Sequence, residues 1–314
     1  MQLELVVKDP IVRGALALFP AFSDAPAAPH YLTGPEAEAS GVLRVSEQGS
    51  GDVPELVVHN SGIEAVLLLE GETLIGAKQN RTLNVSLLVP AGTYLPVPVS
   101  CVEAGRWGAP RAMARSVRHA PSDLRRLKTR GVAESRRRGS GPRSDQGAVW
   151  DRIATYQRDH AVASATGALE DVYGLVDHDV AHLVGELTPL PDQRGVILAI
   201  GDTVRGIDFF DKASTLAAYW PGLVQGYAVD ALRAQPADVT IADAEAFMAQ
   251  VLTAEATTAD AVGLGRDLVI ADAAVAGNAL EWDDAVVHLA AFASPTAPEQ
   301  PRPARRINRS RWVE

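Results

Sequence analysis

The residues best suited to chemistry gather in one stretch, which reads GETLIGAKQNRTLNVSLLVPAGTYLPVPVSCVEAGRW and covers residues 71–107. It holds a lysine, a Gln-Asn-Arg triplet, the only cysteine of the chain, a glutamate and an Arg-Trp pair. Cationic side chains hold phosphate or carboxylate groups, and amides both donate and accept hydrogen bonds. The stretch therefore predicts a site for a phosphorylated, nucleotide-like small molecule.

Six side chains of this stretch are candidates for ligand binding. We expect the cations to hold phosphate, the amides to read a sugar or a base edge, and the indole to stack on a base. The candidates are Lys78, Gln79, Asn80, Arg81, Arg106 and Trp107.

Two carboxylates, Glu103 and Glu70, are the candidates for acid–base catalysis. If the chain is an enzyme, we expect hydrolysis of a glycosidic or phosphate bond. Cys101 is a weaker candidate for a nucleophile, because no histidine lies near it in sequence and most free cysteines are buried packing residues.

The alternative is that the polar strip 71–107 is structural, in a non-catalytic interaction or scaffold protein. Glu103–Arg106 and Glu72–Arg81 would then be internal ion pairs. Exposure separates the two hypotheses, since a ligand site needs these groups to line an open pocket and a structural strip needs them paired and sealed.

Other standard chemistries find little support. A turn of the type PAG suggests a cupin-like roll, but the histidines of a metal cupin are absent, and His178 and His182 lack a third ligand, so no metal site is predicted. There is no phosphate-binding P-loop, and GLGRD at 263–267 leads into a strand, whereas a dinucleotide fingerprint leads into a helix.

Asp211 is expected to cap a helix; alternatively, Asp208 and Asp211 offer a carboxylate to the cavity that Arg81 faces. The residues indicate no particular cofactor.

The elements that must position these residues predict an α+β fold. Short apolar runs separated by turns indicate a β-rich sandwich or roll over residues 1–110, with strands at 56–60, 65–71, 81–89 and 93–102. A basic arm and mobile loop follow at 111–146, then a half with several helices and antiparallel hairpins at 147–293, and a disordered tail at 294–314. The two halves are either separate regions or one intertwined unit over 1–293.

In that second half, helices are expected over 148–174, at 177–187, at 213–233 with a kink or split at Pro221-Gly222, and as a capped helix at 240–255. A hairpin is expected over 195–210, and strands over 266–293 that turn at Gly277-Asn278 and at Asp283-Asp284.

Charge is distributed unevenly along the chain. The net charge is −10, yet residues 111–143 carry eleven basic side chains against two acidic ones, and the tail 302–314 carries five arginines. An acidic body with two basic segments does not indicate a nucleic-acid binder, and the arm either folds against the body or extends into solvent.

No apolar run is long enough for a membrane span and the start is not a signal peptide, so a cytoplasmic protein is expected. The oligomeric state is left open.

The strings LLLEGETLIGAKQNRTLNVSLLVPAG and PVSCVEAGRW carry a family resemblance. The chain resembles the ADP-ribosylglycohydrolase- and rhodanese-phosphatase-associated protein domain family, and GVILAIGDTVRGIDFFD and VVHLAAF are similar too. The resemblance covers most of residues 1–293 and is specific in 71–107. It implies a protein of NAD or ADP-ribose metabolism, or of a stress or conflict system that uses it, and it brings no catalytic residues with it.

Overall fold

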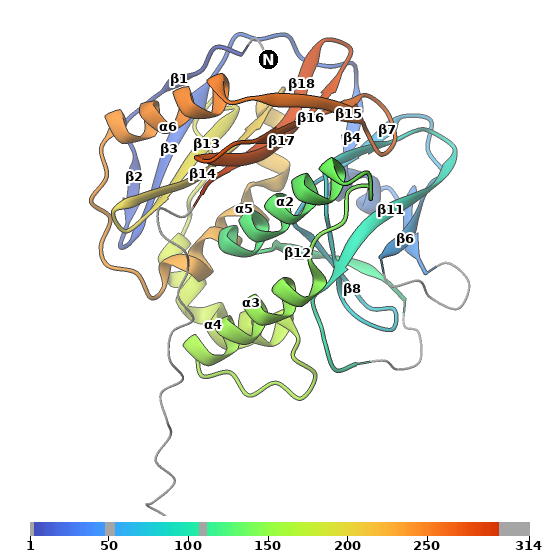
Figure 1. Cartoon of the computed structure of the whole chain (residues 1–314), viewed down its shortest axis with the longest axis horizontal. Coiled ribbons are helices and arrows are strands. Elements are labelled where there is room, and N and C mark those ends of the chain that lie inside the picture. Colours follow the sequence, from blue (N-terminus) through green and yellow to red (C-terminus); the bar gives the residue numbers. More distant parts are fainter. Residues whose placement is uncertain (1–2, 48–53, 107–111, 295–314) are drawn as a thin grey trace, which may run out of the picture.

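The computed structural model describes residues 3–47, 54–106 and 112–294. It is an α+β protein, as predicted, in which a large antiparallel sheet packs beside two smaller sheets and a group of helices (Figure 1). The predicted disordered tail falls almost wholly outside the described residues. No helix in the described part is long and apolar enough to cross a membrane.

The large sheet combines the two ends of the chain. Its strands, in spatial order, are β1 (Val6–Val7), β3 (Leu16–Phe22), β13 (Gly195–Ile200), β14 (Thr203–Phe210), β18 (Ala285–Ala293), β17 (Val275–Trp282), β16 (Arg266–Ala271) and β15 (Ala256–Asp260), with β2 (Ile11–Arg13) paired to β3. Because β3 pairs with β13, the first strands of the chain belong to the sheet of its second half.

The remaining strands form two smaller sheets. One is β10 (Leu87–Val89), β7 (Ala65–Leu68) and β4 (Tyr31–Thr33). The other is β12 (Ala114–His119), β8 (Glu72–Ile75), β9 (Arg81–Leu83), β11 (Thr93–Cys101), β6 (Glu55–Asn60) and β5 (Leu43–Ser46).

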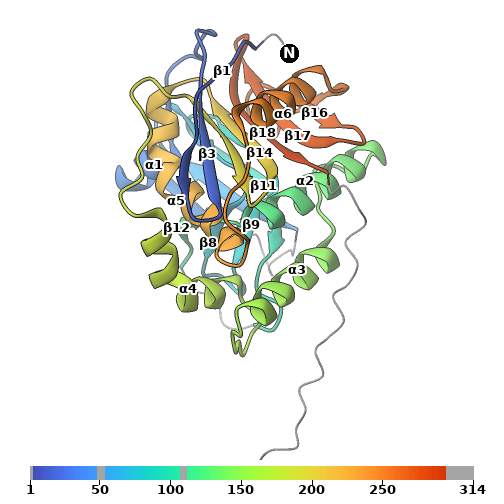
Figure 2. The same cartoon turned by 90° about the vertical axis from the view of Figure 1, so that its left-hand side faces the viewer.

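Helices cover both faces of the large sheet (Figures 1 and 2). Alternate residues of β3 point to opposite faces, so Leu18 packs in the cluster with α5 and Phe19 in the cluster with α6. The helices are α1 (Gly34–Ala39), α2 (Ser122–Arg137), α3 (Gln146–Asp159), α4 (Leu169–Val184), α5 (Ala213–Ala231) and α6 (Ile241–Thr253).

Several local predictions are confirmed. The hairpin 195–210 forms with its turn at Gly201-Asp202, and another turn lies at Asp283-Asp284. Helix α6 begins at a capping box in which Thr240 and Asp243 exchange hydrogen bonds. The helix α5 is a single element that contains Pro221, so it is not split there.

The strand predicted over 81–89 is wrong as one element, because it is two. β9 lies in one small sheet and β10 in the other, and Asn84, Val85 and Ser86 between them turn into the protein centre. The polar side chains cause the break: Asn84 accepts from Ser100, and Ser86 contacts His288.

The turn predicted at Gly277-Asn278 is also wrong, since both residues lie inside β17 and the turn falls at 272–274. A Cβ on Gly277 would lie 2.7 Å from the Cβ of Ala291, so the glycine permits close strand approach.

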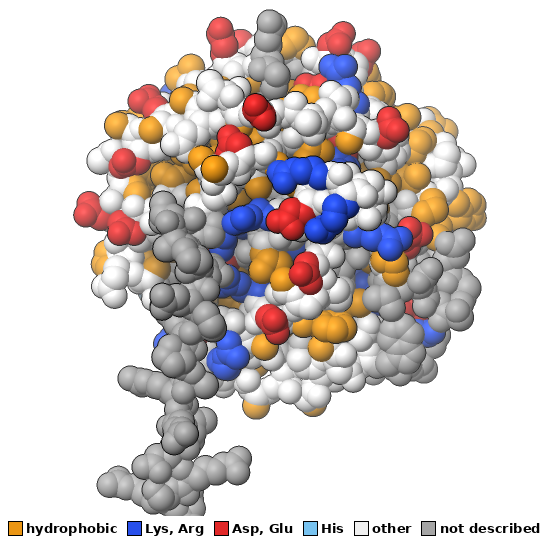
Figure 3. Space-filling model, in the orientation of Figure 1, with side chains coloured by type: hydrophobic (Ala, Val, Ile, Leu, Met, Phe, Trp, Pro, Cys, Tyr) orange, Lys and Arg blue, Asp and Glu red, His pale blue; other side chains and the backbone are white. Residues whose placement is uncertain are grey.

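The basic arm folds against the acidic body. It forms β12 and α2, and Arg115 pairs with Glu72, Arg118 with Glu170 and Arg136 with Asp267. Figure 3 shows basic and acidic side chains side by side across the middle of one face, where Figure 1 places α2.

Two helical glycines predict opposite effects on stability. A Cβ on Gly222 of α5 would lie 2.6 Å from the carbonyl oxygen of Val117 on β12, so Gly222→Ala should lower the free energy of unfolding by about 1–3 kcal/mol. A Cβ built on Gly174 of α4 would have nothing within 4 Å, so Gly174→Ala should raise the free energy of unfolding by about 0.5–1 kcal/mol. Urea unfolding measures both, and a stabilising Gly222→Ala would contradict the packing of α5 on β12.

Candidate functional site

A buried arginine joins three distant parts of the chain at the protein centre. Arg125 of α2 is 0% exposed. Its Nε donates to Oε1 of Glu70 over 2.7 Å, and its Nη1 and Nη2 donate to Oδ2 and Oδ1 of Asp208 on β14 over 2.9 and 2.6 Å. Burial alone would raise the pKa of Asp208, but Arg125 and His288 hold it well below its usual range. Asp208 is therefore an ionised carboxylate.

Two more residues close this network into a ring. Nε2 of His288, on β18, lies 3.2 Å from Oδ1 of Asp208, and its Nδ1 lies 2.8 Å from Oγ of Ser86. The same Oγ accepts from the backbone N–H of Glu70 over 3.0 Å. We call Glu70, Ser86, Arg125, Asp208 and His288 the central ring.

The turn that carries Glu70 is held in place from behind. Nε2 of His119 lies 2.6 Å from the carbonyl oxygen of Glu70. Burial and the nearby Arg125 hold the pKa of His119 well below its usual value, so the imidazole of His119 is neutral. The next residue, Gly71, has φ +85°, and a Cβ there would lie 2.8 Å from the imidazole of His119. Only glycine fits this turn without displacement.

A second buried cation lies beside the ring. Nζ of Lys128 donates to Oγ1 of Thr82 over 3.0 Å and to the carbonyl oxygen of Leu83 over 2.5 Å. Burial lowers the pKa of Lys128 to about 7, although Glu70 opposes this shift. Lys128 therefore changes charge near neutral pH inside the protein.

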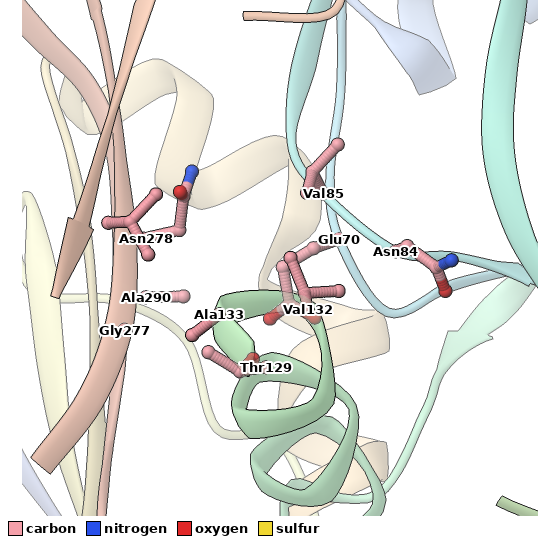
Figure 4. A pocket seen from close by; sticks show the side chains of 10 residues that line it. Glu70, Asn84, Val85, Thr129, Val132, Ala133, Gly277, Asn278 and Ala290 are labelled. Carbon is pink, nitrogen blue, oxygen red and sulfur yellow. The ribbon is translucent and has the colours of Figure 1, made fainter. Parts of the chain in front are cut away.

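A small cavity lies between α2, the large sheet and the Glu70 turn (Figure 4). It has about 10 Å³ of space for the centre of a water-sized sphere, which is enough for about one water molecule. Oε2 of Glu70 is buried and has no hydrogen-bond partner among the residues that the structure describes. The lining residues are Glu70, Asn84, Val85, Thr129, Val132, Ala133, Val269, Gly277, Asn278 and Ala290.

The predicted catalytic Glu103 lies in a different, sealed cluster. It is 4% exposed, its Oε2 is 2.7 Å from Nη2 of Arg106, and it accepts hydrogen bonds from Asn80 N and Thr166 Oγ1 over 3.1 and 2.9 Å. Burial raises the pKa of Glu103, but the contacts with Arg106 and Asn80 lower it by more than burial raises it. The pKa of Glu103 is therefore below its usual value. Arg106 also donates to the carbonyl oxygens of Ala77 and Gly76.

Arg81 is buried as well, at 1% exposure. Its Nη1 donates to Oε1 of Gln79 over 3.2 Å, and no carboxylate pairs with it among the described residues. Burial raises the pKa of the neighbouring Cys101, which Arg81 opposes, so a reactive thiolate is disfavoured. The Glu72–Arg81 ion pair does not form, because Glu72 pairs with Arg115.

The other predicted groups are placed as follows. The backbone N–H of Lys78 donates to Glu47, and Trp107 lies outside the described residues. The two candidate catalytic carboxylates are thus separate, with Glu70 at the central ring and Glu103 packed with Arg106 against the 76–81 loop.

Asp211 does not cap a helix, which corrects the sequence prediction. The N-cap of α5 is Lys212, and the carboxylate of Asp211 accepts from the backbone N–H of Ala28 over 2.9 Å and from the Tyr31 hydroxyl. His178 is 95% exposed, and no group of possible metal ligands gathers within residues 3–47, 54–106 and 112–294.

Sequence reasoning missed most of the central ring. Ser86, Arg125 and His288 lie far apart in sequence and on elements that read as ordinary strands or as a basic arm. The only signal was a set of polar residues inside otherwise apolar runs, such as His288 in AVVHLAAFA and Asp208 in GIDFF.

The comparisons with known proteins identify the family. A family model described as the ARG and Rhodanese-Phosphatase-superfamily-associated Protein domain, ARPP-1, matches residues 4–292. The chain belongs to this family. No protein in the curated set and no solved structure gave a significant match. The match covers all three parts of the central ring, so the ring is part of the family domain.

The buried lysine predicts how stability depends on pH. Lys128 has a pKa of about 7 in the folded protein and an ordinary lysine pKa in the unfolded chain. At pH values between these two pKa values, the unfolded chain therefore binds more protons than the folded protein. Stability should therefore rise with pH above 7, by at most about 1.4 kcal/mol per pH unit for one group. Lys128→Met should reduce this slope, whereas Lys8→Met, at an exposed lysine, should keep it. Urea unfolding from pH 6 to 10 measures the slopes, and equal slopes in wild type and Lys128→Met would contradict the assignment.

Proposed function

We propose that the chain binds, and as an enzyme processes, a small phosphorylated molecule of the nucleotide or ADP-ribose type at the central cavity. One observation carries this proposal: Oε2 of Glu70 is a buried carboxylate oxygen that faces a cavity and lacks a donor among the described residues. A buried polar atom without a partner costs free energy, which a ligand hydroxyl or amine group would recover.

The cavity lining suits the sugar part of such a ligand. Glu70 accepts hydrogen bonds, and the side chains of Asn84, Asn278 and Thr129 both donate and accept. In catalysis Glu70 is then the acid–base group, because it is the carboxylate that contacts the ligand.

For the anionic part of the ligand the proposal assigns Arg81, which lies outside the cavity lining, on a strand that is hydrogen-bonded to the Glu70 turn. It is a buried cation with no carboxylate partner in the described ranges, and Leu83, two residues along the same strand, accepts from the N–H of Gly71 in the Glu70 turn. A phosphate is a bidentate partner for such a guanidinium.

Entry of the ligand requires the cover of the cavity to move, because the present space holds about one water. We assign part of this cover to the loop 138–145, which does not line the cavity itself but contacts a lining residue, since Nδ2 of Asn84 donates to the carbonyl oxygen of Pro142 over 3.3 Å. Gly139 and Gly141 have φ +70° and +73°, and nothing lies within 4 Å of their Cβ positions. The loop is therefore exposed and free of tight packing at its bends.

A cytoplasmic location and the absence of nucleic-acid binding belong to the same proposal.

A second candidate is a non-catalytic interaction or scaffold protein. The observation that favours it is the cluster of Glu103, Arg106 and Asn80, which pairs its charges internally and buries Glu103 and Asn80. On this hypothesis the 71–107 strip only stabilises the fold.

A thermal-shift experiment with matched variants separates these two candidates. ADP-ribose, NAD, AMP and ribose 5-phosphate are tested against wild type, Glu70→Gln and Glu103→Gln. A ligand at 100 times its dissociation constant should stabilise wild type by about 2.7 kcal/mol. Glu70→Gln should lose this gain because the amide oxygen is needed by Arg125, which leaves an NH2 donor in place of the acceptor at the cavity. Glu103→Gln should keep the gain despite a lower melting temperature.

Two results would count against the small-molecule proposal. One is no shift of wild type with any of the four compounds, which favours the scaffold hypothesis. The other is a gain that survives in Glu70→Gln and disappears in a folded Glu103→Gln, which moves the site to the 76–106 cluster.

A further inference from the structure

We infer that Ser86, His288 and Asp208 form a nucleophilic centre beside the central cavity, and that the chain hydrolyses an acyl ester of a small hydroxylated molecule bound there. The inference rests on the proposed function for the place of the ligand. It adds a reaction, and it names as nucleophile a serine of the 71–107 strip that is not among the candidates from the sequence.

The hydrogen bonds give each of the three residues a defined role. Asp208 is ionised, so it accepts the Nε2–H of His288, and the Nδ1 lone pair is then directed at Oγ of Ser86, 2.8 Å away. The serine hydroxyl therefore donates to Nδ1, which is the arrangement of a general base with its nucleophile. Arg125 fixes Asp208 by two hydrogen bonds, and this keeps the imidazole in one tautomer.

The surroundings of Ser86 favour an anionic oxygen there. The backbone N–H of Glu70 already donates to Oγ over 3.0 Å, so it stabilises negative charge that develops when the proton leaves. Two other buried serines lack this setting. Ser100 bonds to Asn84 and Ser144, and Ser122 bonds to Asp230, with no imidazole at either hydroxyl.

The nucleophile lies next to the cavity in the chain and in the sheet. Asn84 and Val85, which directly precede Ser86, line the cavity. Ala290, two residues after His288 and therefore on the same face of β18, lines it as well. Ser86 itself is 3% exposed, so the movement that admits a ligand must also expose its hydroxyl.

The electrostatics of the cavity favour an acyl group over a phosphoryl group as the electrophile. The free carboxylate oxygen of Glu70 faces the space and would repel a negatively charged phosphoryl group placed there. The same oxygen accepts a hydrogen bond from a hydroxyl of the alcohol part of an ester.

The reaction proceeds in two balanced steps. Oγ of Ser86 bonds to the acyl carbon while its proton passes to Nδ1 of His288; the acyl carbon–oxygen bond then breaks, and the alcohol leaves with that proton. Water next gives a proton to His288 and attacks the acyl carbon. The bond to Ser86 breaks, Ser86 recovers its proton, and the carboxylic acid is released.

The test begins with wild-type protein and needs no variant. The protein is treated with diisopropyl fluorophosphate, and its peptides are analysed by mass spectrometry. The inference predicts an adduct on Ser86 and none on Ser100 or Ser122. An absence of any adduct on Ser86 after prolonged treatment overturns it.

Hydrolysis of p-nitrophenyl acetate supplies the second readout. Ser86→Ala and His288→Gln should lower the rate by about 100-fold or more, and Ser122→Ala should leave it unchanged. Equal rates in wild type and a folded Ser86→Ala overturn the inference. The outcome is separable from the proposed function. A Ser86 adduct with no thermal shift from any nucleotide supports the nucleophile and contradicts the nucleotide-type ligand. A thermal shift with no adduct on Ser86 supports the nucleotide-type ligand and contradicts the nucleophile.

Discussion

The guanidinium of Arg125 is the interaction on which the rest of the structure depends. It is fully buried, and it binds a carboxylate from the N-terminal β region and another from the large sheet. Removing three charges from water is costly, and the cost is offset only when geometry and additional hydrogen bonds are complete. Tyr227 and His288 supply further hydrogen bonds to Asp208, so both side chains are fixed by the same requirement, whereas Oε2 of Glu70 has no donor among the described residues.

This requirement also explains why reactive side chains lie at the centre. Because Asp208 must stay ionised beside Arg125, the imidazole of His288 adopts one orientation, and Ser86 is held against it. Glu70 uses one carboxylate oxygen for Arg125 and leaves the other facing the cavity. The network that joins the elements is thus the same network that offers a nucleophile, a base and an acceptor to a ligand.

The sequence predicts local features well and long-range ones poorly. The capped helix that begins at Thr240 and the hairpin over 195–210 depend on neighbouring residues, and both are confirmed. The strand over 81–89 was wrong because its break is caused by partners far away in sequence, among them His288. The sequence predicts a turn at Gly277 wrongly because the close neighbour that requires glycine there, Ala291, belongs to another strand.

The same limit applies to the site. Glu70 could be named because it directly precedes the polar strip, and the Glu103–Arg106 pair is visible as a spacing of three residues. Arg125 could not be distinguished from the ten other basic residues of its segment, because its burial follows from contacts with Glu70 and Asp208 that only the fold creates.

The most direct test of this account is the free energy of unfolding of Arg125→Met, compared with Arg130→Met at an exposed position on the same helix. Urea unfolding of both variants and wild type gives the two differences. The account predicts a loss of about 3–5 kcal/mol for Arg125→Met, because two carboxylates remain buried without their cation, and almost none for Arg130→Met. A loss below about 1 kcal/mol for Arg125→Met would contradict the central place given to this interaction.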